Sequence, residues 1–401
     1  MSNSLLYHAF NIKSVKYCSS SYIGNTIILN AEMTDRKFNC PECQATQHTF
    51  SGRKSRMLHL PPVGRKRCVL KIELHRLCCA QCSYKWWPRL CFMTGSKRYT
   101  RSFALTALDL LQFGTIQAVA RYLQVGWDMI KDIHKTRLQA RYKTPQLKDL
   151  VYLGIDEFSI RKGHTYLTIF VDLHNGRIVH AVEGRSVDAI TPFLKKIARR
   201  APRLKAVAID MSHSYRKAIQ EQLPCVEIVY DRYHISALIN RAIDDLRREE
   251  HQRASSESKS FMKGSRYLLL RNYENLDPNG RHRLQSLLSV NHSLLTMYTM
   301  KEQLHSFWHL ATRQEALSFL YNWCFDALNS GIKQLVKIGM TLYRHQEGLL
   351  GYFTHRITNA VTEGLNNKIK TLKRQAYGFR DMEYFKLRLY HLHTQRYALS
   401  G

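Results

Sequence analysis

The spacing of apolar residues divides this chain into segments with different predicted structure. Apolar positions alternate only weakly in residues 1–30, so no element is predicted there. They recur every three or four residues within 98–145, alternate or run together from Val151, and return to helical spacing after His234. Because a period of two indicates strands and a period near 3.6 indicates helices, the chain is predicted to alternate between helical and sheet-forming regions.

Residues 98–145 are predicted to form three short helices, and a turn containing Gly126 precedes the last one. This order is typical of a helix-turn-helix, whose last helix enters the major groove of DNA. The apolar positions that define the helices are Phe103, Ala107, Leu110, Leu111, Val119, Ala120, Leu123, Met129, Ile130 and Ile133. The candidate DNA-binding residues on or near the last helix are Trp127, Lys131, Lys135 and Arg137.

From Val151 the sequence predicts three strands, then helix, strand, helix and strand. VYLGIDEFSI is the first strand, and HTYLTIFVDLHNGRIVHAVEG is a hairpin with its turn at Asn175 and Gly176. DAITPFLKKIARRAP and SYRKAIQEQLP are helices, LKAVAID is an inner strand, and CVEIVYDRYHI is the last strand. This order is that of an RNase H-like α/β fold, in which the first and fourth strands lie side by side.

The helical text after His234 continues for more than a hundred residues, and we interpret it as an all-α insertion into the α/β core. Trp308 and Trp323 are expected in its hydrophobic core, although one of them could stack on an unpaired base. The predicted domains are a zinc-binding module at 1–95, a helix-turn-helix at 98–145, a first core part at 150–240, the insertion at 241–345 and a second core part at 346–401.

Two carboxylates stand near the ends of strands that are predicted to be neighbours. Asp156 lies in the first strand and Asp210 ends the fourth, so the pair would face each other across the sheet. Clustered carboxylates are the usual protein ligands of paired Mg²⁺ ions. Glu157 and Asp172 are the alternatives. Since successive strand residues point to opposite faces, Asp156 and Glu157 cannot both face the same ions, and the register alone does not choose between them.

The charge of the chain points to a polyanionic partner. Its 61 Lys and Arg residues against 31 Asp and Glu give a formal net charge of +30. The excess is local, since Arg53 to Arg101 contains thirteen Lys or Arg residues and one acid, Glu73. Neutralised phosphates release counterions, so nucleic acid is the expected partner. The sequence shows neither a long apolar span nor a secretory signal, and we expect a reducing, cytoplasmic location.

Seven of the ten cysteines fall between Cys40 and Cys91, which in a reducing compartment favours a metal over disulfides. Two Cys-x-x-Cys pairs stand out, with a basic segment between them that could form a β-hairpin. A four-thiolate zinc site leaves no open position and would be structural. The predicted ligands are Cys40, Cys43, Cys79 and Cys82, while Cys78 could replace Cys79 and Cys68, His48 and Cys91 remain further candidates.

The string ITNAVTEGLNNKIKTLKRQAYGFRDMEYFKLRLY, with GIDEFS, AIDMSHSY and VYDRYHI before it, resembles DDE transposases of bacterial insertion sequences. More narrowly it resembles their ISL-three family, over nearly the whole chain. The resemblance implies an RNase H-like core with a helical insertion, and terminal inverted repeats read by the N-terminal modules. It also implies Asp156, Asp210 and Glu363 as the metal-binding triad. Asp231 and His234 resemble a D-x-x-H motif of related transposases.

In the implied two-metal reaction, Asp156 would bridge both Mg²⁺ (or Mn²⁺) ions, while Asp210 and Glu363 would each hold one. Without the resemblance, Glu363 could equally be an acid favoured by a helix N-terminus. His234 could carry a proton, contact a phosphate or be structural. The helix after Glu363 would hold the cut strand's phosphates with a basic face. That face has Asn366, Asn367, Lys370 and Arg374, and Lys373 is a further candidate DNA-binding residue on the helix.

The sequence therefore predicts a Mg²⁺-dependent DNA transposase that binds its element's ends, cuts them and joins 3′-hydroxyls to target DNA. Because two ends must be brought together, a homodimer or higher assembly on bacterial nucleoid DNA is expected. One alternative is a non-catalytic DNA-binding regulator, which would be expected to lack one of the acids. Another is an RNase H-class nuclease, which would not need the N-terminal modules.

Overall fold

The structure is a computed structural model, and it describes residues 5–34, 38–93, 95–161, 165–255, 259, 262–376 and 378–394. These residues divide into two compact units, one within 1–143 and one within 144–394. In the described ranges no helix is both long and apolar enough to cross a membrane.

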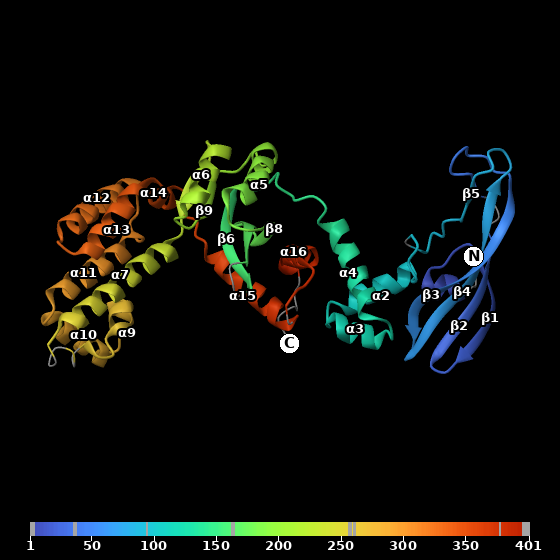
Figure 1. The fold of residues 1–401 in the computed structure, drawn as a ribbon, viewed down its shortest axis with the longest axis horizontal. Coiled ribbons are helices and arrows are strands. Elements are labelled where there is room, and N and C mark those ends of the chain that lie inside the picture. Colours follow the sequence, from blue (N-terminus) through green and yellow to red (C-terminus); the bar gives the residue numbers. More distant parts are fainter. Residues whose placement is uncertain are drawn as a thin grey trace. The chain divides into compact units, whose positions relative to one another are not determined.

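The first unit begins with a sheet that the weak alternation near the N-terminus did not predict. After α1 (Leu5–Phe10), its strands are β1 (Val15–Ile23), β2 (Thr26–Met33), β3 (His48–Val63), β4 (Lys66–Cys79) and β5 (Lys85–Trp86). They lie in the order β1-β2-β4-β3, with β5 paired to β4 (Figure 1). The predicted hairpin between the cysteine pairs is confirmed as β3 and β4. Gly64, with φ +59°, makes its turn, a left-handed conformation that glycine adopts without strain.

Three helices follow the sheet, as the apolar spacing predicted. They are α2 (Arg101–Leu110), α3 (Ile116–Tyr122) and α4 (Trp127–Arg141). The side chains of Thr100 and Thr115 accept backbone N–H groups at the starts of α2 and α3. The predicted turn that contains Gly126 does precede α4. Gln124 adopts the left-handed conformation at φ 53°, while Gly126 is the N-cap of α4 at φ −68°.

The second unit contains a five-stranded mixed sheet in the order β10-β9-β6-β7-β8. Its elements are β6 (Tyr152–Arg161), β7 (Thr165–Asp172), β8 (Arg177–Glu183), α5 (Val187–Arg200), β9 (Ala206–Ile209), α6 (His213–Gln222) and β10 (Glu227–Tyr230). The first and fourth strands do pair. β6 lies parallel to β9, with Tyr152 opposite Ala206 and Gly154 opposite Ala208. The first strand of the unit is therefore the central strand of its sheet.

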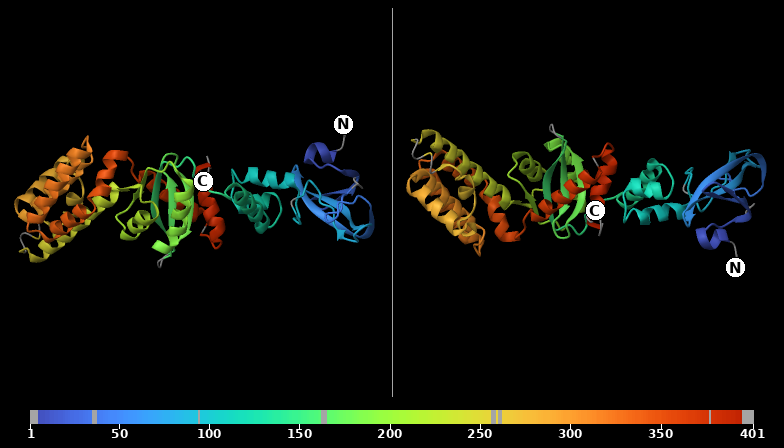
Figure 2. Two further views of the ribbon diagram at one scale, coloured as in Figure 1. Left: turned by 90° about the horizontal axis from the view of Figure 1, so that it is seen from above. Right: turned by 90° about the horizontal axis from the view of Figure 1, so that it is seen from below.

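Alternating residues of the central strands enter two separate cores. Leu153 and Ile155 pack in the core that contains α5 and α6, whereas Phe158 and Ile160 pack against the C-terminal helices α15 (Ala360–Gln375) and α16 (Met382–His391). Figure 2 shows these red helices against the green strands. The β7–β8 turn has four residues, 173–176, rather than two, and only Gly176 is left-handed there, at φ +68°.

Within the described residues, every element from α7 (Arg232–Arg253) to the end of the insertion is a helix. The last predicted strand stops at Tyr230, because Asp231 is already the N-cap of α7. Trp308 and Trp323 are core residues, 7% and 2% exposed, as expected. The remaining elements are α9 (Arg266–Leu270), η1 (Tyr273–Asn275), α10 (Pro278–Ser289), α11 (His292–Phe307), α12 (Arg313–Asn329), α13 (Lys333–Arg344), α14 (Gln346–His355) and η2 (Leu392–Thr394).

Candidate functional site

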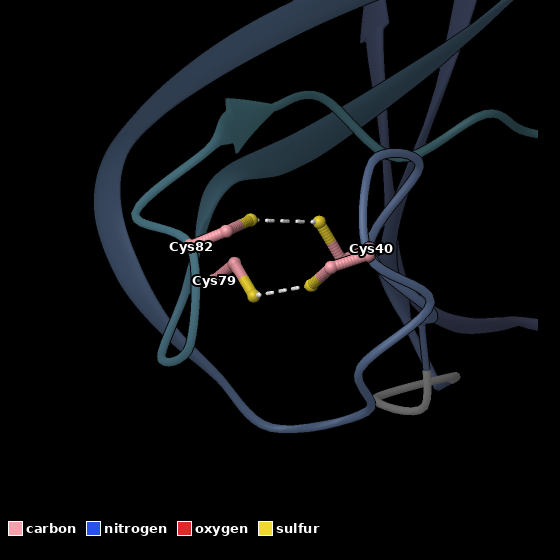
Figure 3. Close-up of side chains that lie close together, drawn as sticks. Cys40, Cys79 and Cys82 are labelled. Atoms are coloured by element: carbon pink, nitrogen blue, oxygen red, sulfur yellow. Dashed lines mark hydrogen bonds between the residues drawn. The ribbon is translucent and has the colours of Figure 1, made fainter.

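The first unit brings four cysteines from two distant turns into one cluster. The sulfur atoms of Cys40, Cys43, Cys79 and Cys82 all lie within 4.8 Å of one another. The sulfurs of Cys40 and Cys82 are 3.5 Å apart (Figure 3). The sulfurs of Cys43 and Cys79 are also 3.5 Å apart. The β3–β4 hairpin makes this possible because it carries the chain out and back, so that Cys79 ends β4 opposite His48.

The other predicted candidates lie outside this cluster. The sulfur of Cys78 is directed at the carbonyl of Ser83, at 3.7 Å, and Nδ1 of His48 lies 2.9 Å from the carbonyl of Thr46. Cys68 is buried in the hydrophobic core of the N-terminal sheet, and burial raises the pKa of its thiol to about 11. Cys91 is exposed. The geometry therefore selects Cys79 over Cys78.

Thiol acidity differs across the cluster. Backbone N–H groups, first that of Cys82 and then that of Gln81, lower the pKa of Cys79 to about 6. The N–H of Tyr84 lowers the pKa of Cys82, but burial and the neighbouring thiols outweigh it and raise that pKa to about 12. The backbone thus stabilises one thiolate, that of Cys79. Ionisation of the remaining thiols in the cluster would require a nearby positive charge.

In the second unit, Asp156 lies on the central strand and is held from two sides. One of its carboxylate oxygens accepts the backbone N–H of Glu157 at 2.7 Å, and the other accepts the side-chain amide of Asn366, on α15, at 2.8 Å. Glu157 points the other way, toward Arg185 and Tyr215. The alternation of the strand thus separates the two acids, as expected.

Asp210 and Asp231 directly follow the neighbouring parallel strands β9 and β10. The N–H of Asp231 donates to the carbonyl of Ile209 at 2.9 Å, which fixes the two acid-bearing turns side by side. His234, in the first turn of α7, places Nε2 3.9 Å from a carboxylate oxygen of Asp231. Asp210, Asp231 and His234 thus gather at the C-terminal ends of β9 and β10, beside Asp156, which lies in the middle of β6 and not near its end as the sequence predicted.

Burial dominates the electrostatics of this end of the sheet. Burial raises the pKa of the Asp156 carboxyl, and the negative charge of Asp210 raises it further. The N–H of Glu157, the amide of Asn366 and the charge of His234 oppose that rise. Burial also raises the pKa of Asp231, against the charge of His234. A bound cation would stabilise the charged forms of these neighbouring buried carboxylates and lower their pKa values.

A glycine allows α15 to approach the central strand. A Cβ on Gly154 would lie 2.8 Å from Oδ1 of Asn359 and 3.1 Å from Thr362, so a larger residue would push the start of α15 away. Position 363 is in the first turn of this helix, one turn before Asn366. The side chain of Glu363 lies outside the described part of the structure. Among the described side chains, only the four cysteines converge with three or more ligand atoms within 4.8 Å of one another.

Comparison with known proteins decides the family. The sequence model of the DDE_Tnp_ISL3 family, described as "Transposase", matches residues 153–389. The transposase for insertion sequence element IS1001 of Bordetella parapertussis is 34% identical over 370 residues, which is 91% of each chain. The chain belongs to this transposase family.

Two more distant likenesses were found for this transposase. The transposase for insertion sequence element IS1557 of Mycobacterium tuberculosis is 25% identical over 288 residues, or 66% of this chain and 65% of the relative. A solved structure, the Drosophila P element transposase strand transfer complex, covers 76% of this chain and 94% of its own at 12% identity with a TM-score of 0.40. At that TM-score the likeness carries no weight for the fold.

Some side chains of the predicted basic face on α15 are exposed to solvent, and others are bonded to β6. Asn367, Lys370 and Arg374 are exposed on α15, whereas Asn366 is turned to Asp156. Lys373 donates to the carbonyls of Ser159, at 3.3 Å, and Ile160, at 2.6 Å. In the first unit, Trp127 is 42% exposed at the start of α4, with the Lys131 amine 5.4 Å from its ring centroid.

Sequence reasoning missed some residues that shape the site. It treated Asn366 as a phosphate contact rather than as the partner of Asp156, and it did not single out Asn359, whose backbone N–H donates to Asp231. It also missed Tyr215, buried at 1% exposure, whose hydroxyl lies 3.0 Å from that of Thr168. The one available signal was position, since Asn359 and Asn366 flank Glu363 on the same helix.

Proposed function

We propose that this transposase cuts DNA at the ends of its insertion sequence and joins the 3′-hydroxyls to target DNA, using Asp156, Asp210 and Glu363 as ligands of divalent metal ions in an RNase H-like core. The observation that supports this most strongly is the pairing of β6 with β9, which places Asp156 beside Asp210. The hydrogen bond from Asn366 adds support, because it ties the helix that carries Glu363 to the same carboxylate.

The donor set suits Mg²⁺ or Mn²⁺, which bind carboxylate oxygens in preference to nitrogen or sulfur. Bound ions would supply charge neutralisation at the cut phosphate and activation of water or a 3′-hydroxyl. The residues of the chain would position the side chains around the ions and the phosphate. Asp156 would be held rigid by Glu157 N–H and Asn366, and Asp231 would orient His234 toward the reacting phosphate.

We further propose that the four-cysteine cluster holds a structural Zn²⁺. A tetrahedral ion with Zn–S distances of about 2.3 Å separates its sulfurs by about 3.8 Å. The observed sulfur distances of 3.5 Å are close to that value without any adjustment of the hairpin. Four thiolates leave no open coordination position, so the ion would stabilise the module and take no part in cutting DNA.

The N-terminal unit is the proposed reader of the terminal inverted repeats, with α4 in the major groove. Trp127, Lys131 and Lys135 would contact DNA there, and Asn367, Lys370 and Arg374 would hold phosphates near the carboxylates. Cytoplasmic action on nucleoid DNA follows from this partner. The high positive charge predicts that binding to end DNA weakens by orders of magnitude between about 50 and 200 mM salt. A flat salt profile in a filter-binding assay would contradict this part of the proposal.

The direct test is an Asp156→Asn variant assayed on DNA that carries the inverted repeats flanking the gene. Cleavage in Mg²⁺ should be lost while end binding, measured by gel shift, is kept. Asp149→Asn is the matched control, because the Asp149 side chain is 81% exposed in the same unit and pairs with Arg203, whose side chain is 65% exposed. Cleavage by Asp156→Asn at the control's rate would remove Asp156 from the site.

A further inference from the structure

Basic side chains from α6 and from the junction of α13 and α14 lie close together beside β10. Arg216 is on α6, Arg344 ends α13, and His345 lies between α13 and α14. Their proximity affects the pKa of His345, which burial lowers and which the charges of Arg216, Arg344 and His213 lower further. We call this group the Arg216 cluster, and it consists of His213, Arg216, Arg344 and His345.

Tyr230, the last residue of β10, connects the Arg216 cluster to the sheet. Its hydroxyl lies 3.0 Å from Nδ1 of His345. Burial raises the pKa of this hydroxyl, whereas the charge of Arg216 and a hydrogen bond from Arg216 oppose the rise. Since a guanidinium can only donate, the phenol oxygen accepts from Arg216 and directs its own proton to Nδ1 of His345. The hydroxyl thus positions Arg216 without neutralising its charge.

The Arg216 cluster is held next to two of the candidate metal ligands' turns. Tyr230 is opposite Ile209 in the parallel pair of β10 and β9, and the next residues along the two strands are Asp231 and Asp210. After burial, the charge of Asp210 also raises the pKa of Tyr230, so this acid is within electrostatic reach of the cluster. A Cβ on Gly348 would overlap the ring of Tyr230, which shows how tightly α14 packs on this strand end.

The charge of Arg216 is not balanced by an acid of the described chain. Arg216 forms no ion pair with a described carboxylate, whereas the next residue, Lys217, lies 3.9 Å from Glu221. Arg216 and His345 are half-buried, and the other two members of the cluster are exposed. A guanidinium presents paired N–H donors that match two oxygens of one phosphate. A phosphate would therefore supply the negative charge that Arg216 lacks.

We propose that the Arg216 cluster is a binding site for a backbone phosphate of the DNA strand that reaches the carboxylates, with the phosphate bonded to the Arg216 guanidinium. DNA that approaches Asp156 and Asp210 brings negative phosphates toward negative side chains, and a fixed cation beside them offsets part of that repulsion. The inference rests on the proposed function, because it takes DNA as the substrate. It does not require that the carboxylates hold metal ions.

The test measures binding of the full-length chain to end DNA without added Mg²⁺ or Mn²⁺, so that cleavage plays no part. Arg216→Gln should weaken binding about tenfold, as the loss of a charged hydrogen bond does. It should also reduce the slope of log affinity against log salt by about 0.9, the contribution of one phosphate. Arg216→Lys keeps the charge and should keep the wild-type slope. Lys217→Gln is the matched control, because this adjacent side chain is 61% exposed, and it should bind like wild type.

A second measurement locates the contact with end DNAs that each carry one neutral methylphosphonate linkage. One linkage should weaken binding by wild type and by Lys217→Gln but not by Arg216→Gln, which has already lost that contact. Losses that add at every linkage, or a wild-type salt slope for Arg216→Gln, would mean that Arg216 only supports Tyr230 and would overturn the inference.

Thermal melting checks that Arg216→Gln is folded. If it is not, Arg344→Gln tests the same cluster from an exposed position, where the salt slope should fall by a smaller amount and a wild-type slope would overturn the inference. Failure of the wild-type chain to bind end DNA would contradict the proposed function itself. Loss of cleavage in Asp156→Asn together with an unchanged slope in Arg216→Gln would contradict this inference alone.

Discussion

Asp156 is held in place by a neutral side chain that belongs to a helix more than two hundred residues later. The amide of Asn366 donates to the carboxylate oxygen that Glu157 N–H leaves free. Partners of this kind orient metal ligands, and their loss typically costs about 10–100-fold in metal affinity or activity.

Asn366→Ala should therefore slow cleavage of end DNA by about 10–100-fold and raise the Mg²⁺ concentration that gives half-maximal rate. Gln375→Ala, an exposed change near the end of the same helix, is the control for general effects on α15. An unchanged Mg²⁺ dependence in Asn366→Ala would show that the amide does not position Asp156.

A buried lysine also has a purely structural role in the helical insertion. Lys301 is 4% exposed, and its amine donates to the carbonyls of Leu269, at 3.1 Å, and Arg271, at 2.6 Å, where α9 ends. These carbonyls have no further turn of helix to bond them. Burial lowers the pKa of Lys301, while Glu302 opposes that shift.

Lys301→Met keeps the length of the side chain but removes the amine that donates to both carbonyls, so that Arg271 keeps only the hydroxyl of Tyr298 as a donor, at 3.1 Å. The free energy of unfolding should fall by about 1–3 kcal/mol in urea denaturation. Lys333→Met, at an exposed position of α13, should change it far less. Equal effects of the two substitutions would mean that the buried amine contributes nothing specific.

Among the elements, the β3–β4 hairpin determines which cysteines can share an ion. It brings Cys79 and Cys82 to Cys40 and Cys43, and its register turns Cys78 aside toward Ser83. Cys79→Ser should therefore lose the bound Zn²⁺, whereas the adjacent Cys78→Ser should keep about one ion per chain. Metal analysis of the purified proteins by mass spectrometry measures this. Zinc lost from Cys78→Ser but kept by Cys79→Ser would reverse the assignment.

The contact between β8 and α5 contains a histidine that folding keeps neutral. The ring of His180 stacks on Phe193, with centroids 4.0 Å apart. Burial, with the charges of Lys196 and Lys386, lowers the pKa of His180 to about 4 from its usual value of 6.5. The unfolded chain thus takes up a proton at a higher pH than the folded chain. This contribution to stability is complete above pH 6.5 and is lost as the pH falls toward 4.

Wild type should accordingly lose more stability than His180→Phe between pH 7 and pH 4.5, by at most about 3 kcal/mol. Urea denaturation midpoints of both proteins at the two pH values give the comparison. The difference between the proteins isolates His180 from other groups that titrate in this range. If both proteins lost the same stability between the two pH values, protonation of His180 would not be the cause of the loss.

Much of the element order could be read from the sequence, because periodicity reports burial directly. The helices at 101–141 and the pairing of β6 with β9 agree with that reading. β1 and β2 were missed because their outer faces are exposed and their alternation is weak. The start of α7 was misplaced because YDRYHI continues an apolar strand pattern, while Asp231 as the N-cap decides the boundary.

For the molecule as a whole, the site depends on contacts that no local pattern contains. Asp156, Asp210 and Asp231 come from three parallel strands, and α15 reaches them only because Gly154 leaves room. Sequence alone could nominate the acids and the cysteine pairs by residue type and spacing. It could not show that Asn366 bonds Asp156, since that contact spans 210 residues.

The measurement that tests the central claim most directly is Mn²⁺ binding to the full-length chain with end DNA, followed by electron paramagnetic resonance. If Asp156, Asp210 and Glu363 form one site, Asp156→Asn, Asp210→Asn and Glu363→Gln should each lose at least one bound ion, while Asp149→Asn binds like wild type. A Glu363→Gln chain that binds Mn²⁺ with wild-type number and affinity would contradict the claim that these three acids act together.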